Sequence, residues 1–411
     1  MPSADVTALL GTWEGYRVGT VGRFEAGELG DGSKTPQVLI ELVRRPGPKI
    51  CSGCGRRCEK WHDWEERWVR DLPILDAETD LCVQRFRVAC PDCGPRVEEL
   101  SWLNLYARAT NRLAESVARL CRDGTVQAAA KFYGLSWDAA KAMDRAYLDR
   151  TLGEPDLSGL TLLAMDEFAI KKGHRYATIF VEPTRKQVLW VCKGRSREDI
   201  RPFFERLGEE GRRRLQAVAM DMNGAYEAEV RAQCPQARIV FDAFHVVAKY
   251  GREVIDEVRR QEAARQEGRR ERAVVKGSRW LLLRNAENLK RADRVKLSEL
   301  LKANRRLATV YILKDDLKRL WEYQLPSHAM RFWKEWRQRA MRSRIEPLKR
   351  FTRRLAAKLE GILAHCWFPL HTSLLEGMMN QIKVIKRKAF GFRDEDYFFL
   401  KVRAAFPGKA G

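Results

Sequence analysis

The chain has 411 residues, a formal net charge of +22 at pH 7 and a pI near 9.7. Hydrophobic residues make up 45% and charged residues 32%, a balance that excludes a wholly disordered chain. The sequence holds no run of about 18 uncharged apolar residues, so we expect no membrane span. Residues 1–10 lack the basic start of a secretory signal, and we expect a cytoplasmic, nucleoid-associated protein. The positive charge indicates a polyanionic partner, most often nucleic acid.

Four of the ten cysteines form two closely spaced pairs, Cys51-x2-Cys54 and Cys90-x2-Cys93, each followed by a glycine. Two thiolates separated by two residues can bind one ion while the backbone turns around it, and two such pairs complete a tetrahedral zinc site. Nearby residues that could replace one of these ligands are Cys58, His62 and Cys82.

The residues around these cysteines favour a small β module. The strand-like run 82–88 lies between the two pairs, which suits a zinc ribbon-like module over residues 38–105. The preceding residues, 1–37, form an N-terminal extension to which the sequence assigns no role.

Residues 125–143 have the pattern of a helix-turn-helix. Small apolar residues fill the first helix, Gly134 suits the tight turn, and Ser136 can cap a second helix. We therefore predict a DNA-binding domain over residues 106–152, although any short helical hairpin can look similar. The side chains expected to face DNA are Trp137 and Lys141.

Three apolar, strand-like runs each end in an aspartate: Asp166, Asp221 and Asp242. We assign these runs to an α/β core over residues 158–248. If their carboxyl ends share one edge of a sheet, the carboxylates repel each other, and a pair of Mg²⁺ ions would relieve the repulsion. Aspartates at strand ends also act as turn formers and helix caps, so both interpretations stay open.

Residues 249–360 contain 32 Lys or Arg against 15 Asp or Glu, a net charge of +17. The stretch is rich in good helix formers, and we predict a basic α-helical region over residues 249–366. Seventeen unbalanced charges repel one another, and bound phosphates would neutralise them.

A further acid, Glu376, lies in the last predicted segment, residues 367–411. On a helix, Glu376, Asn380, Lys383 and Arg387 share one face. This face could hold a metal ion and the DNA backbone together, but its periodicity alone favours a solvated polar stripe.

Several of these motifs together resemble the ISL3-type insertion-sequence transposases of the DDE class, and the resemblance covers the chain from about residue 38. The residues that carry it are Cys51–Gly55, Phe86–Gly94, Asp166–Tyr176, Met220–Tyr226, Ile239–Val247, Arg279–Leu283 and Leu375–Phe392.

The resemblance implies a multidomain protein with a zinc ribbon-like N-terminal module, a helix-turn-helix, and an RNase H-like α/β catalytic domain interrupted by a large α-helical insertion. Asp166, Asp221 and Glu376 match the three metal-binding acids of the family. The 154 residues between Asp221 and Glu376 leave room for the insertion. His245 is expected to contact a phosphate or the scissile strand, and Asp242 to support the site.

The resemblance also implies the cofactors and partners. The catalytic site is expected to use Mg²⁺ or Mn²⁺, and the cysteines to hold a structural Zn²⁺. The expected partners are double-stranded DNA, as transposon inverted-repeat ends and target DNA, and further copies of the chain in a homodimer or higher oligomer. On the Glu376 helix, the expected DNA contacts are Asn380, Lys383, Lys386 and Arg387.

Three other functions would use only some of these sequence features. A zinc-containing, sequence-specific DNA-binding regulator would need the N-terminal half but not the acid-ended strands or Glu376. A domesticated, inactive transposase would not need an intact set of acids. A tyrosine recombinase would need a tyrosine nucleophile soon after its His-x2-Arg element; His328-x2-Arg331 fits that element, but Tyr397 follows much too late.

Overall fold

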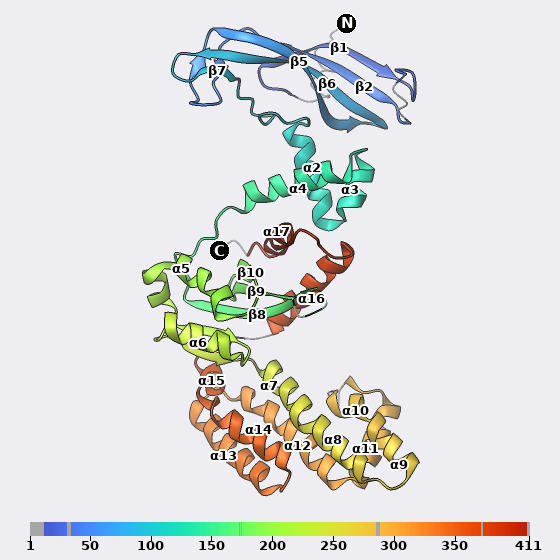
Figure 1. Ribbon diagram of the computed structural model, residues 1–411, viewed down its shortest axis with the longest axis vertical. Helices are drawn as coiled ribbons and strands as arrows, with labels where there is room; N and C mark the ends of the chain where they lie inside the picture. The colour runs from blue at the N-terminus through green and yellow to red at the C-terminus, as the bar shows by residue number, and fades with distance from the viewer. Residues whose placement is uncertain are drawn as a thin grey trace. The chain divides into compact units, whose positions relative to one another are not determined.

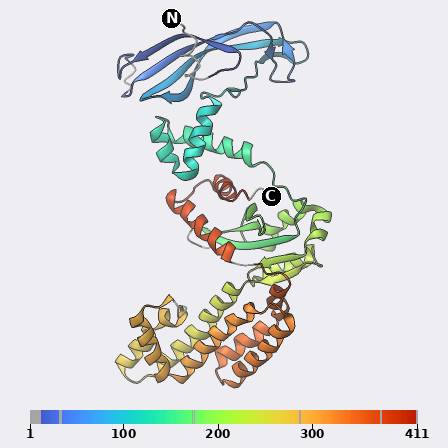
Figure 2. The same cartoon turned by 180° about the vertical axis from the view of Figure 1, so that it is seen from behind.

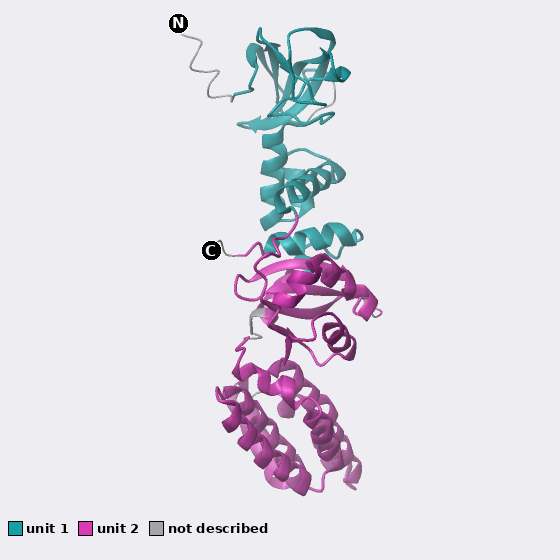
Figure 3. Ribbon diagram, turned by 90° about the vertical axis from the view of Figure 1, so that its left-hand side faces the viewer, with its two compact units in different colours: residues 1–153, 385–405 teal, residues 154–384, 406–411 magenta. Residues whose placement is uncertain are grey.

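The computed structural model describes residues 12–30, 34–171, 173, 175–284, 288–370 and 373–408, without the side chains of residues 373 and 374. The chain divides into two compact units (Figure 3). The first combines Met1–Gly153 with Ile385–Ala405, and the second combines Glu154–Val384 with Phe406–Gly411. Within the described residues, no helix has both the length and the apolar character needed to cross a bilayer.

The first unit begins with a five-stranded sheet of order β1-β2-β6-β5, in which β7 also pairs with β6 (Figure 1). Its strands are β1 (Tyr16–Phe24), β2 (Gln37–Arg44), β5 (Trp61–Ile74), β6 (Ala77–Cys90) and β7 (Gly94–Val97). One face of this sheet forms a core of its own, with Ile40, Leu42 and Leu81 at most 1% exposed. A short hairpin of β3 (Lys49–Ile50) and β4 (Arg57–Cys58) lies between β2 and β5 in the sequence.

This sheet is larger than the predicted zinc ribbon-like module, and it starts before residue 38. Strand β1 pairs antiparallel with β2, so much of the predicted N-terminal extension belongs to the fold. The sequence of β1 gave little sign of a strand, because Gly19 and Gly22 interrupt its apolar alternation.

Three helices follow the sheet: α2 (Asn111–Asp123), α3 (Val126–Phe132) and α4 (Trp137–Leu152). The hydroxyl of Thr125 accepts a hydrogen bond from the Ala128 backbone at 3.0 Å, and that of Ser136 accepts one from Ala139 at 3.2 Å. These caps accept hydrogen bonds from backbone amides of the first helical turn, which have no acceptor within the helix. Gly134, in the turn, has a φ of +63°, a conformation that glycine adopts without strain. The helices α3 and α4 are therefore the predicted helix-turn-helix.

The C-terminal helix α17 (Glu395–Ala405) packs against α4 and belongs to the same unit, not to a catalytic core over residues 367–411 as predicted. The buried carboxylate of Asp144 accepts hydrogen bonds from the Tyr397 hydroxyl and from Lys401 Nζ, the latter at 2.9 Å. The carboxylate of Asp394 accepts from Lys141 Nζ at 2.9 Å and from Arg145 at 3.0 Å. Charged groups thus hold α17 to the helix-turn-helix.

The second unit is built on a mixed sheet of order β10-β9-β8-β11-β12. Its strands are β8 (Leu162–Lys171), β9 (Arg175–Glu182), β10 (Gln187–Lys193), β11 (Ala217–Met220) and β12 (Arg238–Phe241). The first three run antiparallel to one another, whereas β11 pairs parallel with both β8 and β12. Helices α5 (Arg197–Arg214) and α6 (Gly224–Gln233) connect β10 to β11 and β11 to β12 (Figure 1).

Between β12 and residue 366, the described chain is helical, as both views of the ribbon show (Figures 1 and 2). The elements are α7 (Ala243–Tyr250), a π-helix (Gly251–Ile255), α8 (Asp256–Arg265), α9 (Arg269–Gly277), α10 (Arg279–Leu283), α11 (Arg291–Ala303), α12 (Arg305–Lys318), a 3₁₀ turn (Arg319–Glu322), α13 (Pro326–Arg342), α14 (Glu346–Ala356), α15 (Leu359–Leu363) and a last 3₁₀ turn (Ala364–Cys366).

Helix α15 lies directly against β12. A Cβ at Gly361 would lie 2.6 Å from the Phe241 ring and 3.2 Å from the Ile239 carbonyl oxygen, so only glycine permits this close approach. The helical region is thereby packed onto the sheet beside Asp242.

Helix α16 (Ser373–Lys388) is amphipathic. Among its described side chains, Leu375, Met378, Met379 and Ile382 are buried, whereas Glu376, Asn380 and Lys383 are exposed. The polar face predicted from the sequence is therefore a real face of this helix.

The Asp144 cluster predicts a large and specific stability effect. Asp144→Ala would leave the ammonium of Lys401 and the Tyr397 hydroxyl without their partner, and we expect a loss of about 3 kcal/mol in the free energy of unfolding of the first unit. Urea unfolding with hydrogen exchange of α4 and α17 measures it. Asp149→Ala, on the same helix but in an exposed pair with Arg145, is the matched control and should change stability by less than about 0.5 kcal/mol. Equal stability of the two variants would contradict this role of Asp144.

Candidate active site and metal-binding cluster

Three aspartates lie level with one another at neighbouring strands: Asp166 in β8, Asp221 directly after β11 and Asp242 directly after β12. The parallel register pairs Ala219 with Ala164 and Met220 with Phe241. Continued along the chain, this register sets Asp221 beside Asp166 on one side and beside Asp242 on the other. The strand ends were predicted correctly for Asp221 and Asp242, which follow β11 and β12 directly.

Asp166 is not at the end of its strand, contrary to the prediction. Strand β8 continues to Lys171, because its antiparallel pairing with β9 extends to the pair Lys171–Arg175. Its pairing with β11, however, covers only Leu162 to Ala164. Asp166 therefore lies just beyond the point where the parallel pairing stops, and its carboxylate reaches the same edge as the other two.

His245, in the first turns of α7, lies among these three carboxylates. Its Nδ1 is 3.1 Å from an Asp221 oxygen, and its Nε2 is 3.9 Å from Asp166 and 3.7 Å from Asp242. Asp242 also caps α7, since it accepts a hydrogen bond from the Phe244 backbone at 2.7 Å. This cap fixes the start of the helix that carries His245.

The pKa shifts of the cluster follow from burial and crowding. Burial, aided by the charges of Asp242 and Asp221, raises the pKa of Asp166 to about 6, against the opposing charge of His245. Burial alone would lower the pKa of His245, but its hydrogen bond to Asp221 and the surrounding carboxylates raise it to about 9. Despite its own burial, Asp221 has a lowered pKa, because His245 and the Met222 amide stabilise its charged form. At neutral pH, one imidazolium thus faces three carboxyl groups.

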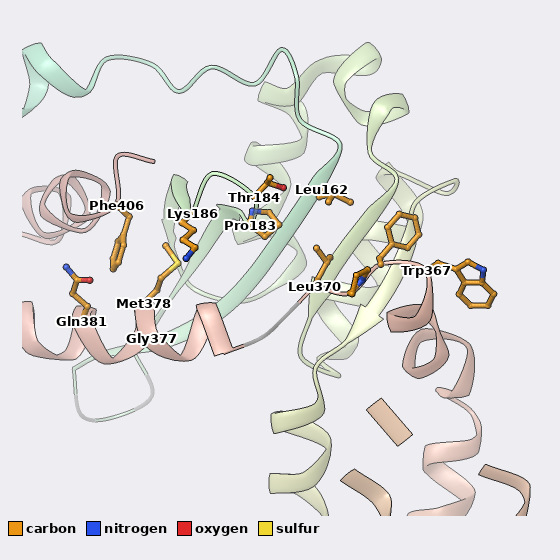
Figure 4. A pocket seen from close by; sticks show the side chains of 12 residues that line it. Leu162, Pro183, Thr184, Lys186, Trp367, Leu370, Gly377, Met378, Gln381 and Phe406 are labelled. Atoms are coloured by element: carbon orange, nitrogen blue, oxygen red, sulfur yellow. The ribbon is translucent and has the colours of Figure 1, made fainter. Parts of the chain in front are cut away.

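Glu376 is exposed on α16. Among the described residues, the only set of three or more His, Cys, Asp or Glu with ligand atoms all within 4.8 Å of one another is a cysteine cluster, so neither the three aspartates nor Glu376 with Asp166 and Asp221 form so tight a group. The neighbouring residues of α16 instead line a cavity of about 1020 Å³ at the β9–β10 turn. Figure 4 shows Met378 directed from α16 toward Lys186 of that turn. Asp166 and Asp221 both lie within 3.9 Å of His245, whereas the role of Glu376 as their partner stays a prediction.

A smaller cavity, of about 490 Å³, opens beside Asp221 and reveals residues that the sequence did not indicate. It is lined by Glu167, Arg195, Ser196, Asp221, Asn223 and Ala225. The Arg195 guanidinium pairs with Glu167 at 2.7 Å and lies 4.0 Å from the centre of the Tyr176 ring. No spacing rule distinguishes this arginine from the many others in the chain, and only the folded sheet brings it to the aspartates.

The four predicted cysteines come together at one end of the first sheet. The sulfur atoms of Cys51, Cys54, Cys90 and Cys93 lie within 4.8 Å of one another, which suits tetrahedral binding of one metal ion. Burial opposes ionisation of Cys90, but the backbone amides of Cys93 and Asp92 lower the pKa of its thiol to about 6. A thiolate that is stabilised in this way is a good metal ligand.

The alternative ligands separate into two cases. Cys58 is buried beside the cluster as a fifth thiol, but it is not one of the four whose sulfur atoms lie within 4.8 Å of one another. Cys82 and His62 also lie outside that set. Cys82 is midway along β6, opposite Trp68 and Glu41, and the His62 Nδ1 is 3.1 Å from an Asp63 carboxylate oxygen.

The predicted DNA contacts also differ in their surroundings. Trp137, at the start of α4, is 45% exposed. Lys141 is paired with Asp394, and its ammonium lies 5.6 Å from the centre of the Trp137 ring. The sequence could not indicate this pairing, because Asp394 is far away along the chain. On α16, Lys383 donates to the Asn380 side chain at 3.3 Å, and Arg387 is exposed.

A helix-turn-helix joined in one chain to a sheet with aligned aspartates is an arrangement suited to an enzyme that acts on DNA. Family comparisons specify which one: a family model described as transposase matches residues 163–402, and a model of the helix-turn-helix domain of transposase family ISL3 matches residues 98–148. The chain belongs to this family of DDE transposases, enzymes that cleave DNA and transfer its strands.

Individual relatives agree with the family assignment. The chain is 50% identical over 405 residues to the transposase for insertion sequence element IS1001 of Bordetella parapertussis, covering 98% of both chains. It is 27% identical over 400 residues to the transposase for insertion sequence element IS1557 of two Mycobacterium tuberculosis strains, covering 90% of this chain and 88% of theirs.

Proposed function

We propose that this transposase cleaves and joins DNA at transposon ends by a two-metal phosphoryl transfer, with Asp166, Asp221 and Glu376 as the metal ligands. The proposal rests on the alignment of three carboxylates, at β8, β11 and β12, around the His245 imidazolium. Such an excess of buried negative charge calls for a further cation.

The topology of the second unit supports an RNase H-like core. A three-stranded antiparallel meander, β8 to β10, is extended on the β8 side by the parallel strands β11 and β12. The described helices α7 to α15 lie in sequence between β12 and α16, as a helical insertion between the second and third acids would.

The donor set of the acid cluster fits Mg²⁺ or Mn²⁺, since both prefer carboxylate oxygens. When bound, two such ions would activate the attacking oxygen and stabilise the leaving oxygen of the phosphodiester. Asp166 and Asp221 would hold them from adjacent strands. We propose that Glu376 joins these aspartates when DNA occupies the site.

His245 and Asp242 would support this chemistry. The His245 imidazolium fixes the Asp221 carboxylate through the 3.1 Å contact and could bind a phosphate of the scissile strand. Asp242 holds the first turn of α7 and thereby the position of His245. The exposed side of Arg195, in the cavity beside Asp221, would contribute a second positive charge for the DNA backbone.

The DNA contacts are proposed to come from three elements. Trp137 would contact the inverted repeat from the helix-turn-helix, whereas Lys141 supports α4 through Asp394. The basic region over residues 249–366 would bind phosphates along the duplex. On α16 the proposed contacts to transposon-end or target DNA are Asn380, Lys383, Lys386 and Arg387. We place this activity at the nucleoid in the cytoplasm, carried out by a homodimer or higher oligomer.

For the cysteine cluster we propose a structural Zn²⁺, because four thiolates without a fifth, open position are typical of structural zinc sites. The ion would join the hairpin of β3 and β4 to the end of β6.

The acid cluster predicts which substitutions abolish cleavage. Glu376→Gln removes a charge while keeping the side-chain shape, so DNA binding should persist while cleavage of labelled transposon-end DNA with Mg²⁺ or Mn²⁺ falls about 10²–10³-fold. Asp166→Asn and Asp221→Asn should behave alike, and the triple variant should be little worse, because the three act as one unit. Glu335→Gln, an exposed acid on α13, is the control and should cleave normally.

Near-normal cleavage by Glu376→Gln would show that the third ligand is another acid, with Asp242 the next candidate. Absence of cleavage by the unaltered chain, with end-specific binding intact, would instead identify a DNA-binding protein without transposase activity.

The zinc proposal has its own measurement. The full chain purified without chelators should contain about one zinc per molecule. Cys54→Ser should lose it and loosen the region around residues 49–58, because a structural metal contributes folding free energy. Cys82→Ser, on the same strand as Cys90 but away from the cluster, should retain the metal. Unaltered zinc content in Cys54→Ser would contradict the assignment.

A further inference from the structure

Strand β5 carries three large aromatic side chains that the fold leaves uncovered. Trp61, Trp64 and Trp68 are 53%, 50% and 56% exposed. Trp64 and Trp68 point to the same face of the sheet, opposite the face that packs into the core. The rings of Trp61 and Trp64 both contact Phe86, at 5.8 and 6.3 Å between centres. A row of exposed tryptophans on one strand is typical of an interaction surface.

Strand β5 is also the edge of its sheet. Within the described chain, β6 is the only strand that pairs with residues 61–69. Residues 106–110 approach β5 at its Arg67–Arg70 end, where Arg67 reaches the Tyr106 carbonyl and Arg70 exchanges backbone hydrogen bonds of 2.9 Å with Arg108 and Thr110, so the pairing proposed below would end before Arg70. An edge strand that is long and carries large apolar side chains readily pairs with another strand.

The charges around these tryptophans disfavour DNA as the occupant. Trp68 pairs across the sheet with Cys82, and the carboxylates of Glu66 and Glu41 add to burial in raising the pKa of that thiol. Both acids lie on the face that presents Trp64 and Trp68. Phosphates would be repelled there, although aromatic stacking alone could accept bases.

We propose that β5 pairs antiparallel with β5 of a second copy of this chain, around a two-fold axis at Glu66. Antiparallel edges related by a two-fold axis place one residue opposite itself, and its neighbours pair symmetrically on either side. With the axis at Glu66, Trp64 of each copy lies opposite Trp68 of the other. Glu65 of each copy then lies opposite Arg67 of the other.

The sequence of β5 selects this register over its neighbours. An axis at Glu65 would set Trp64 opposite Glu66, and an axis at Arg67 would bring two guanidinium groups together. An axis at Trp64 would oppose Asp63 to Glu65. The axis at Glu66 alone gives two opposite-charge pairs and two aromatic pairs at once, which are the cross-strand pairs that stabilise sheets.

One nitrogen of Arg67 already donates to the Tyr106 carbonyl of its own chain at 3.2 Å, so the pair with Glu65 of the second copy would use its other nitrogens. The register also has an unfavourable element. The two Glu66 carboxylates face each other at the axis, and like charges directly opposite are destabilising. The proposal therefore predicts a substitution that strengthens the dimer as well as substitutions that weaken it.

Sedimentation velocity of the full chain tests the proposal through a charge exchange. Glu65→Arg and Arg67→Glu should each weaken dimerisation about tenfold to hundredfold, because every substitution acts twice across the axis. The double variant E65R/R67E restores opposite charges and should recover an affinity near that of the unaltered chain. Glu66→Gln should dimerise more tightly than the unaltered chain.

A second test removes the exposed tryptophans and measures the oligomeric state again. Trp64→Ser with Trp68→Ser should leave a folded monomer, with its metal content and circular dichroism unchanged. Trp280→Ser, which removes a tryptophan that is 64% exposed in the helical region, is the matched control and should dimerise normally. A monomeric unaltered chain at 100 µM, a dimer that survives loss of both tryptophans, or a charge exchange that restores nothing would overturn the proposal.

Discussion

The parallel register of β8, β11 and β12 is the constraint on which the catalytic unit depends, because it sets three carboxylates side by side. A shift of one strand by a single residue would turn its aspartate to the other face of the sheet. The register is held by the buried cores of these strands, and α15 closes on β12 at Gly361 without room for a Cβ. The resulting crowding of negative charge accounts for the raised pKa of His245 and for a site suited to cations.

The first unit depends on a different kind of contact. Asp144 and Asp394 bind α17 to the helix-turn-helix through hydrogen bonds and ion pairs, so the end of the chain completes the DNA-binding unit. Helix α16, which carries Glu376, leads directly into this docked helix.

Local signals made much of this structure predictable. The cysteine spacing predicted that the four thiols come together, and the small residues with Gly134 and Ser136 predicted the helix-turn-helix, because turns and caps depend on neighbouring residues. Asp221 and Asp242 were placed correctly, since apolar runs that stop at an acid mark strand ends. Contacts between distant segments were missed: the pairing of β1 with β2, the extension of β8 by β9, and the engagement of Lys141 by Asp394. The resemblance gave Glu376 a role as a metal ligand, and that role stays a prediction.

In the proposed mechanism, Asp166 and Asp221 bind a catalytic divalent cation and Glu376 completes the site on DNA. Replacing Mg²⁺ by Fe²⁺ and adding ascorbate and peroxide generates radicals that cut the polypeptide beside the bound ion. If the proposed site binds the ion, the free protein should be cut near residues 166 and 221, and excess Mg²⁺ should suppress these cuts. A further cut near residue 376 should appear when transposon-end DNA is present. Cuts that avoid residues 166 and 221, or that Mg²⁺ does not suppress, would contradict the proposed mechanism.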